Sequence, residues 1–337
     1  MMIIRPVTQG DHKEILALAQ EAGIGMTSLP PDSTVLERKI ARSVASIHQR
    51  IEVKKDESFL FVMEDSESRK LVGTCGVVSH VGMKHPFYSY KLSTIVQASD
   101  EVGVYSLQRV LHMVNDYTGA SEIGSLFLLP DYRRDGIGRF LSRCRFLFVA
   151  QFPDLFSDVM IAEIRGVQDE EGHSPFYQNL AQHFFQMDFK RADFVNATTG
   201  SQFISDLMPK YPIYVNLLDP KAQAVIGRPF NASRPAMKLL EAEGFRHQGY
   251  VDVFDAGPTL QVETAQIRTV RESRLEPLAG IKRLSGKPTH MVCNARLEEC
   301  RIALTTLQQH DKGIFLCEEA AIALNVAKGD EIRFIEL

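Results

Sequence analysis

Residues 126–138 read LFLLPDYRRDGIG, and this run predicts a strand, a glycine turn and a helix in direct succession. The apolar start suits a strand that ends at Pro130, and the charged turn after it contains Gly136 and Gly138. Residues 139–148 then have the amphipathic pattern that is typical of a helix. Such a turn directs backbone N–H groups and the positive end of a helix dipole to one point, where phosphate binds. The run therefore predicts an α/β arrangement with an anion site at the turn.

The spacing of the glycines narrows the kind of phosphate. No Gly-Lys-Ser/Thr follows, so the turn is not a Walker loop, and it is not G-x-G-x-x-G either. The pattern R-x-x-G-x-G that starts at Arg133 resembles the coenzyme A pyrophosphate loop of the GCN5-related N-acetyltransferases; the alternative is an ordinary strand–turn–helix connection. The resemblance implies that the pyrophosphate is held by Arg133, Arg134, Gly136, Ile137, Gly138 and Arg139.

The bulk composition excludes several other classes of protein. With 337 residues and 45% hydrophobic content, the chain can form one large domain and a smaller one. The net charge of −4, without a basic stripe, does not favour nucleic acid as a partner. The sequence shows no signal peptide and no apolar run of membrane-spanning length, so we expect a cytoplasmic protein away from the membrane. Five cysteines without C-x-x-C, and ten histidines without H-E-x-x-H, predict reduced thiols and no metal.

Hydrophobic periodicity predicts an ordered series of elements for the first half of the chain. The order strand, helix, helix, three strands, helix, strand matches the N-acetyltransferase topology, so we expect an α/β (α+β) fold with a mixed, twisted sheet and helices on both faces. In that fold two neighbouring parallel strands splay apart around the pantetheine arm. Residues 84–105 are expected to be less regular. The strands are predicted at 3–7, 58–64, 71–79, 125–129 and 159–164, and the helices at 11–21 and 34–49.

The second half predicts an insertion and a separate tail. Residues 231–245 resemble the late helix of the same fold, with Gly244 at its C-terminal end and a strand at 250–254. A helical insertion at about 165–230 precedes it. We therefore predict an acyl-CoA N-acyltransferase domain at 1–275 and a small β-rich domain at 276–337. Insertion helices are expected at 175–185, 202–208 and 220–226; the tail has strands at 291–294, 301–305 and 332–335 and a helix at 318–324.

Further segments resemble one family, the arginine N-succinyltransferases. The resemblance covers roughly residues 1–275 in order and is weaker in the tail. It implies transfer of the succinyl group from succinyl-CoA to the α-amino group of L-arginine, the first step of a bacterial route of arginine breakdown. The segments are 5–7 (RPV), 27–30 (TSLP), 115–119 (NDYTG), 164–166 (IRG), 174–176 (SPF), 187–189 (MDF), 192–194 (ADF), 207–214 (LMPKYPIY) and 254–260 (FDAGPTL).

This reaction needs a neutral amine, an oxyanion donor and an acid for the leaving thiolate. Deprotonating an α-amino group with a pKa of about 8 costs on the order of 1–2 kcal/mol at neutral pH, which a base or a water chain can supply. A backbone N–H on the strand before the phosphate loop suits the oxyanion, and Leu126 and Leu128 are the candidates. Most of the rate can come from holding the amine and the thioester together.

The sequence departs from the family at the acid–base positions. The family is credited with a catalytic histidine where this chain has Phe230, which carries no transferable proton. Leu240 stands where many N-acetyltransferases have a tyrosine acid, and Tyr117 stands where many relatives have histidine. Either positioning and solvent suffice, or another group has taken over the role, or the protein has diverged in substrate or activity.

Several side chains are candidates for the missing role. Glu163, Tyr177 and Tyr117 are the catalytic candidates, and His247 is a weaker one. Each has a structural alternative: packing for Tyr177, simple exposure for His247. Asp252 and Asp255 either face the guanidinium of the substrate or act as turn residues, and Cys144 is expected to lie in the core.

The remaining alternatives concern the substrate and the assembly. An acyltransferase of the same fold acting on ornithine or with another acyl-CoA fits the sequence, as does a non-catalytic subunit that binds acyl-CoA. A homo-oligomer or a complex with a partner subunit is also compatible with it.

Overall fold

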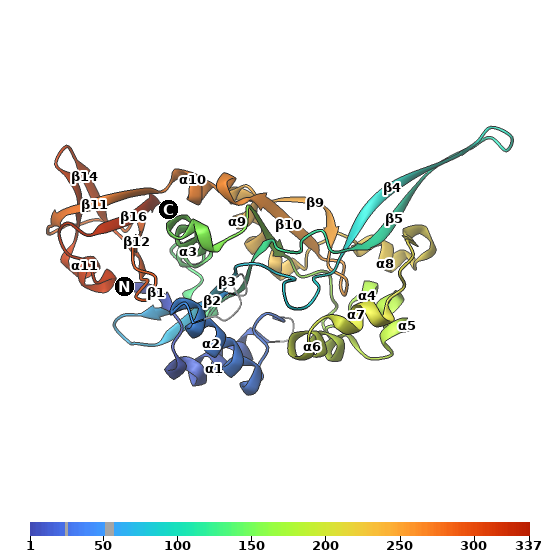
Figure 1. Cartoon of the computed structure of the whole chain (residues 1–337), viewed down its shortest axis with the longest axis horizontal. Coiled ribbons are helices and arrows are strands. Elements are labelled where there is room, and N and C mark those ends of the chain that lie inside the picture. Colours follow the sequence, from blue (N-terminus) through green and yellow to red (C-terminus); the bar gives the residue numbers. More distant parts are fainter. Residues whose placement is uncertain (24–25, 51–56) are drawn as a thin grey trace. The chain divides into compact units, whose positions relative to one another are not determined.

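The computed structural model describes residues 1–23, 26–50 and 57–337, which form two compact units. Unit 1 comprises residues 1–79, 121–158 and 263–337, and unit 2 comprises residues 80–120 and 159–262 (Figure 1). In the described part of the chain, no helix has the length and apolarity needed to cross a membrane.

Unit 1 is built on a sheet in which the N-terminal strand is central. Strand β1 (Met2–Pro6) pairs antiparallel with β2 (Ser58–Asp65) on one side and with β13 (Ile302–Thr305) on the other. Strand β2 forms a hairpin with β3 (Leu71–Val78), and β3 pairs with β6 (Ser121–Leu128). The predicted hairpin across residues 65–70 is therefore confirmed.

Helices cover both faces of this sheet, because the side chains of β2 alternate between them. Leu60 and Val62 pack in one core with helices α1 (His12–Ala22) and α2 (Ser33–Ile47). Their neighbours Phe59 and Phe61 point to the opposite face, where both rings contact Phe148 at centroid distances of 5.2 and 4.8 Å. Phe148 belongs to helix α3 (Ile137–Gln151). The predicted mixed sheet with helices on both faces is confirmed.

The C-terminal strands belong to the same unit. Strand β12 (His290–Asn294) pairs with β13 and with β16 (Glu331–Glu336), and β16 pairs with β11 (Arg274–Ile281). Strands β14 (Leu307–His310) and β15 (Gly313–Leu316) and helix α11 (Glu318–Leu324) complete this β-rich segment, which has the predicted strands and helix. Two short elements, η6 (Thr264–Gln266) and α10 (Arg268–Glu272), lead into it.

Unit 2 has its own strands, in the order β7-β10-β9-β4-β5-β8. The prediction of an irregular region at 84–105 was wrong, since β4 and β5 form a long antiparallel hairpin. Their polar serine, threonine and glutamine residues obscured the alternation. The strand predicted at 250–254 instead spans residues 246–251. It ends there because Asp252 begins a turn. The bounds are β4 (Ser89–Ser99), β5 (Val104–Val114), β7 (Val159–Glu163), β8 (Ile213–Tyr214), β9 (Arg246–Val251) and β10 (Pro258–Glu263).

The insertion supplies the helices of unit 2, which pack on a core rich in aromatic residues. The helix expected at 175–185 is broken at Leu180, whose φ and ψ of −134° and −79° are not helical. Gly244 has φ +109° and closes the late helix as predicted, because a left-handed residue there costs glycine little. The helices are α4 (Pro175–Asn179), α5 (Ala181–Phe185), α6 (Phe189–Thr199), α7 (Gln202–Leu207), α8 (Pro220–Val225) and α9 (Arg234–Glu243).

Candidate active site

The predicted phosphate loop connects β6 to α3 within unit 1. A short 3-10 turn at 130–132 ends the strand, and the chain then turns tightly before α3 starts at Ile137. The side chain of Arg133 links this turn back to the end of β6. Its Nε donates to the carbonyl oxygen of Leu128 at 3.0 Å, and its guanidinium lies 5.9 Å from the ring centroid of Phe127. Gly136 precedes the helix with φ +80°, a left-handed conformation that is unfavourable for residues other than glycine.

Several amides of this loop are available to a ligand. The N–H groups of Gly136, Gly138 and Arg139 form no hydrogen bond with any other described residue, whereas the Ile137 amide donates to the carbonyl of Arg134. Helix α3 is 15 residues long and has no acidic residue in its first turn to offset its dipole. Free amides and the positive end of a dipole together form an anion site.

The glycines of the loop leave space outside the protein. A Cβ atom on Gly138 would come no closer than 3.8 Å to any atom, the Cδ2 of Leu128. A Cβ on Gly136 would meet only the Cδ2 of Leu337, at 3.6 Å. Packing within the chain therefore does not require glycine at 138. A ligand that approaches the backbone would explain it.

A bulge in β6 orients the strand before the loop. The pairing of β3 with β6 shifts register between Thr74 and Gly76, and Ser125 has φ +52°. Beyond the bulge, Leu129 donates to the carbonyl of Val72, so by alternation Phe127 also bonds to β3. The amides of Leu126 and Leu128 then point to the opposite edge of β6. That direction is required of the predicted oxyanion donors.

A half-buried pair of ionisable residues next to this bulge was missed by sequence reasoning. Lys39 of α2 donates through Nζ to the Ser28 carbonyl at 2.5 Å and to the Ser125 hydroxyl at 3.0 Å. Burial lowers the pKa of Lys39 to about 8, and it raises the pKa of Glu122 on β6 to about 7, against the opposing effect of the Lys39 charge. Ser28 lies in the TSLP segment, which was noted, but nothing in the sequence linked Lys39 to Glu122.

In unit 2, a polar cluster surrounds the predicted candidate Tyr117. Its hydroxyl donates to Oε1 of Gln261 at 2.5 Å, and its ring centroid lies 4.6 Å from that of Tyr250. The Tyr250 hydroxyl donates to Asp116 at 2.7 Å and accepts from Lys91 at 2.7 Å. Asp116 lies in the NDYTG segment, whereas no sequence signal marked Lys91.

Glu163, at the end of β7, belongs to the electrostatic surroundings of Tyr117. Burial raises the pKa of Tyr117, and the electrostatic effects of the nearby Tyr250, Asp116 and Glu163 raise it further. Tyr117 is therefore protonated at neutral pH, as an acid must be. The structure brings these two candidates together, and their catalytic roles stay predictions.

Tyr177 lies elsewhere, in the aromatic core of unit 2. Its side chain is fully buried against Phe185 and Phe189, and its hydroxyl donates to the carbonyl oxygen of Met187 at 3.1 Å. Burial raises its pKa. None of its polar partners belongs to the Tyr117 cluster, and these contacts agree with the packing alternative.

The position of the expected histidine is held by backbone contacts. The Phe230 amide donates to the carbonyl of Arg165 at 2.7 Å, and the preceding Pro229 bridges to Gly166. Neither contact uses the side chain, so the loop can keep this shape with a phenylalanine. Leu240 is buried, and His247 is exposed with its Nδ1 3.2 Å from the Thr259 carbonyl.

The two aspartates near the end of β9 are engaged by backbone amides. Oδ1 of Asp252 accepts from the amides of Phe254 and Asp255, and Asp255 accepts from those of Gly166 and Gly257. Burial, and then the charge of Asp255, raises the pKa of Asp252 to about 8. Arg165 lies 3.8 Å from Asp255, and its guanidinium is 5.1 Å from the Phe189 ring centroid. These contacts agree with the alternative in which both aspartates act as turn residues.

Cys144 lies in the core of α3, as expected. It is fully buried, its Sγ is 3.5 Å from that of Cys75, and burial raises its pKa well above the usual range. A thiol in this setting is a poor nucleophile.

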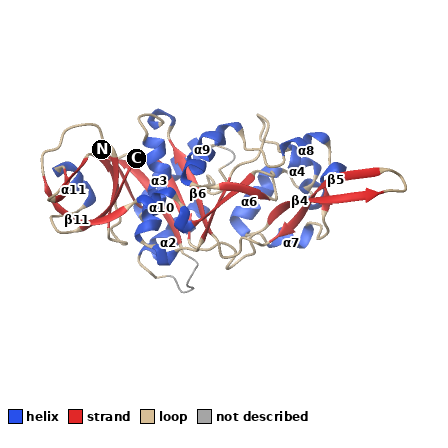
Figure 2. Ribbon diagram, turned by 90° about the horizontal axis from the view of Figure 1, so that it is seen from above, coloured by secondary structure: helices blue, strands red, loops and turns tan. Residues whose placement is uncertain are grey.

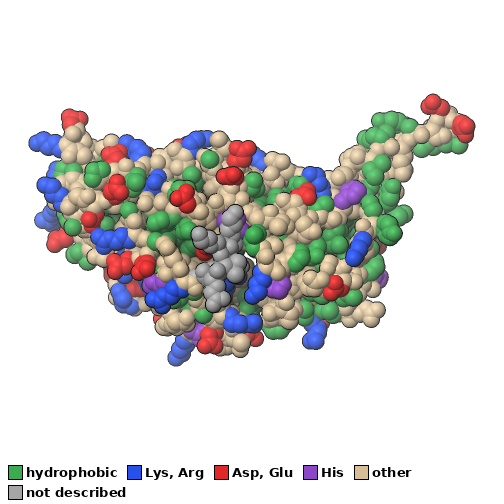
Figure 3. Space-filling model, viewed as in Figure 1, with side chains coloured by type: hydrophobic (Ala, Val, Ile, Leu, Met, Phe, Trp, Pro, Cys, Tyr) green, Lys and Arg blue, Asp and Glu red, His purple; other side chains and the backbone are tan. Residues whose placement is uncertain are grey.

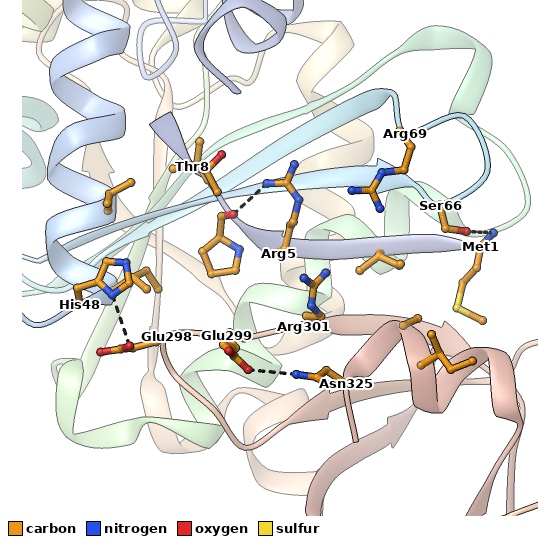
Figure 4. Close-up of a pocket in the computed structure, with 18 of the residues that line it drawn as sticks. Met1, Arg5, Thr8, His48, Ser66, Arg69, Glu298, Glu299, Arg301 and Asn325 are labelled. Carbon is orange, nitrogen blue, oxygen red and sulfur yellow. Dashed lines mark hydrogen bonds and ion pairs between the residues drawn. The ribbon is translucent and has the colours of Figure 1, made fainter. Parts of the chain in front are cut away.

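A cavity of about 680 Å³ lies elsewhere in unit 1, between β1 and the C-terminal segment. Arg5 on its wall is bonded to Asp11 and Glu64. His48 pairs with Glu298 at 3.5 Å, as Figure 4 shows with a dashed line. None of the predicted CoA-binding or catalytic residues lines it.

Comparison with known proteins decides the family. A family model described as the arginine N-succinyltransferase beta subunit matches residues 2–269, and a second model, the C-terminal domain of that subunit, matches residues 274–336. The chain belongs to the arginine N-succinyltransferase family. The resemblance noted from the sequence is thereby confirmed.

Individual members of the family match over the full length. An arginine N-succinyltransferase of Escherichia coli is 41% identical over 338 aligned residues, which cover 100% of this chain and 98% of the relative. The Escherichia fergusonii enzyme is 40% identical with the same coverage. The solved structure of arginine/ornithine succinyltransferase subunit AI from Pseudomonas aeruginosa is 34% identical, with a TM-score of 0.90 over 100% of this chain and 98% of that one. The fold described above is therefore the fold of the family.

Proposed function

We propose that this protein transfers the succinyl group of succinyl-CoA to the α-amino group of L-arginine. The observation that carries the proposal is the set of free amides at Gly136, Gly138 and Arg139 at the start of α3, in a chain that belongs to the arginine N-succinyltransferase family. In this proposal the amides bind the CoA pyrophosphate, assisted by the cationic side chains of Arg134 and Arg139. Arg133 acts mainly by stabilising the turn through its hydrogen bond to the carbonyl oxygen of Leu128.

The chemical step is a direct attack of the amine on the thioester carbonyl. A C–N bond forms, the C–S bond breaks, and the ammonium proton passes to a base. The amide of Leu126 or Leu128 stabilises the oxyanion, and an acid protonates the leaving thiolate. Glu122, with a pKa of about 7, is suited to a base at neutral pH, and Tyr117 is suited to an acid because it holds its proton. Glu163 is the alternative base.

In this proposal the reaction takes place in the cytoplasm. The five cysteines form no disulfide, which fits a reducing compartment. The proposed co-substrate is succinyl-CoA, and the chemistry of amine and thioester needs no Lewis acid beyond the oxyanion donor.

The proposal is tested by incubating the purified protein with succinyl-CoA and L-arginine. We expect free thiol to appear with a product heavier than arginine by one succinyl group, as measured by mass spectrometry. A panel with ornithine and with acetyl-CoA measures the preference, since the name of the Pseudomonas aeruginosa relative includes both amines. Tight CoA binding with no thiol release from either amine would contradict the proposal and favour a non-catalytic subunit.

A further inference from the structure

The β4–β5 hairpin extends far beyond the rest of unit 2 (Figures 1 and 2). At its base, Tyr90 and Lys91 pair with β9, and Val110 and Leu111 pair with β8. Among the described residues, those between 93 and 109 pair only with each other. We call residues 93–109 the arm. A two-stranded ribbon by itself is marginally stable in water, so an arm of this length calls for a covering partner.

One face of the arm is apolar and exposed. Residues directly opposite in an antiparallel pair share a face, so the pairs Val96–Leu107 and Ala98–Tyr105 lie on one side. Val96, Tyr105 and Leu107 are 53%, 72% and 63% exposed. Hydrophobic side chains gather along the arm in Figure 3, with acidic ones at its tip. We call Val96, Ala98, Tyr105 and Leu107 the apolar arm face.

This face continues the core of unit 2 outward. Beyond the Thr94–Arg109 pair, the same side carries Leu92 and Tyr90, four and six residues nearer the base than Val96, and Leu92 pairs with the buried Leu111. The opposite side of the arm carries Gln97, Ser106 and Gln108 in its middle, with Ile95 nearer the base and Val104 nearer the tip. The arm is therefore more apolar on one side than on the other, and no described strand of unit 2 pairs with it beyond its base. The apolar arm face exposes on the order of 400 Å², which is comparable to the largest apolar patch of a typical monomer, a patch that is often functional.

We propose that the apolar arm face binds the same face of a second copy of this chain, with the two arms antiparallel across a two-fold axis. Charge placement favours this occupant. The tip carries Asp100 and Glu101, and the base of the same face carries the exposed Arg109, for which the described residues supply no ion pair. The midpoint between 101 and 109 along β5 is Tyr105, opposite Ala98. A two-fold axis at that level brings the tip of each arm to Arg109 of the other.

The size of the contact agrees with a reversible dimer. The longer arm strand, at 93–99, has seven residues and spans about 23 Å, and two such faces bury on the order of 1,000 Å² in total. That is the lower range of specific interfaces, so we expect dissociation in the micromolar range.

Sedimentation velocity from low micromolar to about 100 μM protein tests the proposal over the range expected for such an interface. We expect a monomer–dimer equilibrium for the full chain. Leu107→Glu should weaken it at least about 100-fold, because a charge would be buried without a partner. Gln108→Glu is the matched control: the same charge is added one residue away, on the polar side, and the dimer should remain. Unchanged circular dichroism shows that both variants fold.

Two further variants separate arm–arm packing from other contacts. Arg109→Glu should weaken the dimer, and adding Glu101→Arg should restore it. Ala98→Cys lies at the proposed axis and should form a disulfide-linked dimer under mild oxidation. A chain that stays monomeric at 100 μM, or a dimer that Leu107→Glu leaves intact, would overturn the proposal; in the first case the arm would bind a protein of different sequence.

Discussion

The two glycines of the phosphate loop lead to opposite predictions for stability and the same prediction for binding. Gly138 lies inside the first turn of α3 without a positive φ, and an added Cβ meets nothing closer than 3.8 Å. Alanine is favoured over glycine in a helix by about 0.5–1 kcal/mol, so Gly138→Ala should stabilise the free protein by up to that amount. Gly136 has φ +80°, and there alanine should cost about 1–2 kcal/mol.

Binding should suffer in both variants. If the CoA pyrophosphate accepts hydrogen bonds from the amides of residues 136–139, a methyl group on Gly138 prevents the closest approach. A hydrogen bond to a charged group contributes about 1.5–3 kcal/mol. The loss of one such bond corresponds to about a 10- to 150-fold increase in the Kd for CoA.

Calorimetric titration with CoA and thermal melting of the same samples measure both effects. Gly10→Ala is a suitable control, since Gly10 also has room for a Cβ, its nearest neighbour being Thr8 Oγ1 at 3.7 Å, but lies in another part of unit 1. We expect Gly138→Ala to melt at the same or a higher temperature while binding CoA at least tenfold more weakly. Unchanged CoA affinity in a folded Gly138→Ala protein would refute the assignment of the loop.

Four other predictions follow from the candidate residues. Phe230→His should raise kcat at least about tenfold if a proton carrier is missing, since general acid–base catalysis contributes 10²–10⁴-fold. Tyr117→Phe should lower kcat with little change in melting, whereas Tyr177→Phe should lower stability by about 1 kcal/mol and leave kcat unchanged. Glu122→Gln should remove the rise of kcat with pH near 7, where the base form of this carboxyl appears. The folded-state pKa of Asp252 is raised to about 8 from an unfolded value of about 4, so its contribution to stability is lost as pH rises through this window, and Asp252→Asn should flatten the melting temperature measured from pH 5 to 9.

The order of the early elements could be predicted because each has a strong local signal. The β2–β3 hairpin has two mainly apolar, buried runs on either side of a polar turn, and the α3 helix follows its glycine turn directly. The long β4–β5 hairpin could not be predicted in this way. Its arm carries serine, threonine and glutamine in place of a buried alternation, and the signal of a strand weakens where no core lies beside it.

The candidate site was predictable only in its backbone part. A phosphate loop is encoded within one short segment, so its residues are adjacent in the sequence. The pair formed by Lys39 and Glu122, 83 positions apart in the printed sequence, exists only because the Lys39 side chain of α2 reaches β6, where it also bonds to Ser125. Lys91 reaches Tyr250 by strand pairing between β4 and β9. Tertiary contacts of this kind leave no local pattern.

Phenylalanine at position 230 does not by itself exclude catalysis. The amide of Phe230 and the bridge from Pro229 keep the loop in place without any side chain, so the position retains its geometry. General acid–base catalysis contributes about 3–5.5 kcal/mol to lowering a barrier, whereas correct orientation of two reactants contributes about 7–11 kcal/mol. In the proposed mechanism the larger share therefore belongs to the loop at 136–139 and to the amides of Leu126 and Leu128, which are all present here. A chain that keeps this backbone and loses one proton carrier is expected to be slowed, and a second carrier such as Glu122 or Tyr117 would recover part of the loss.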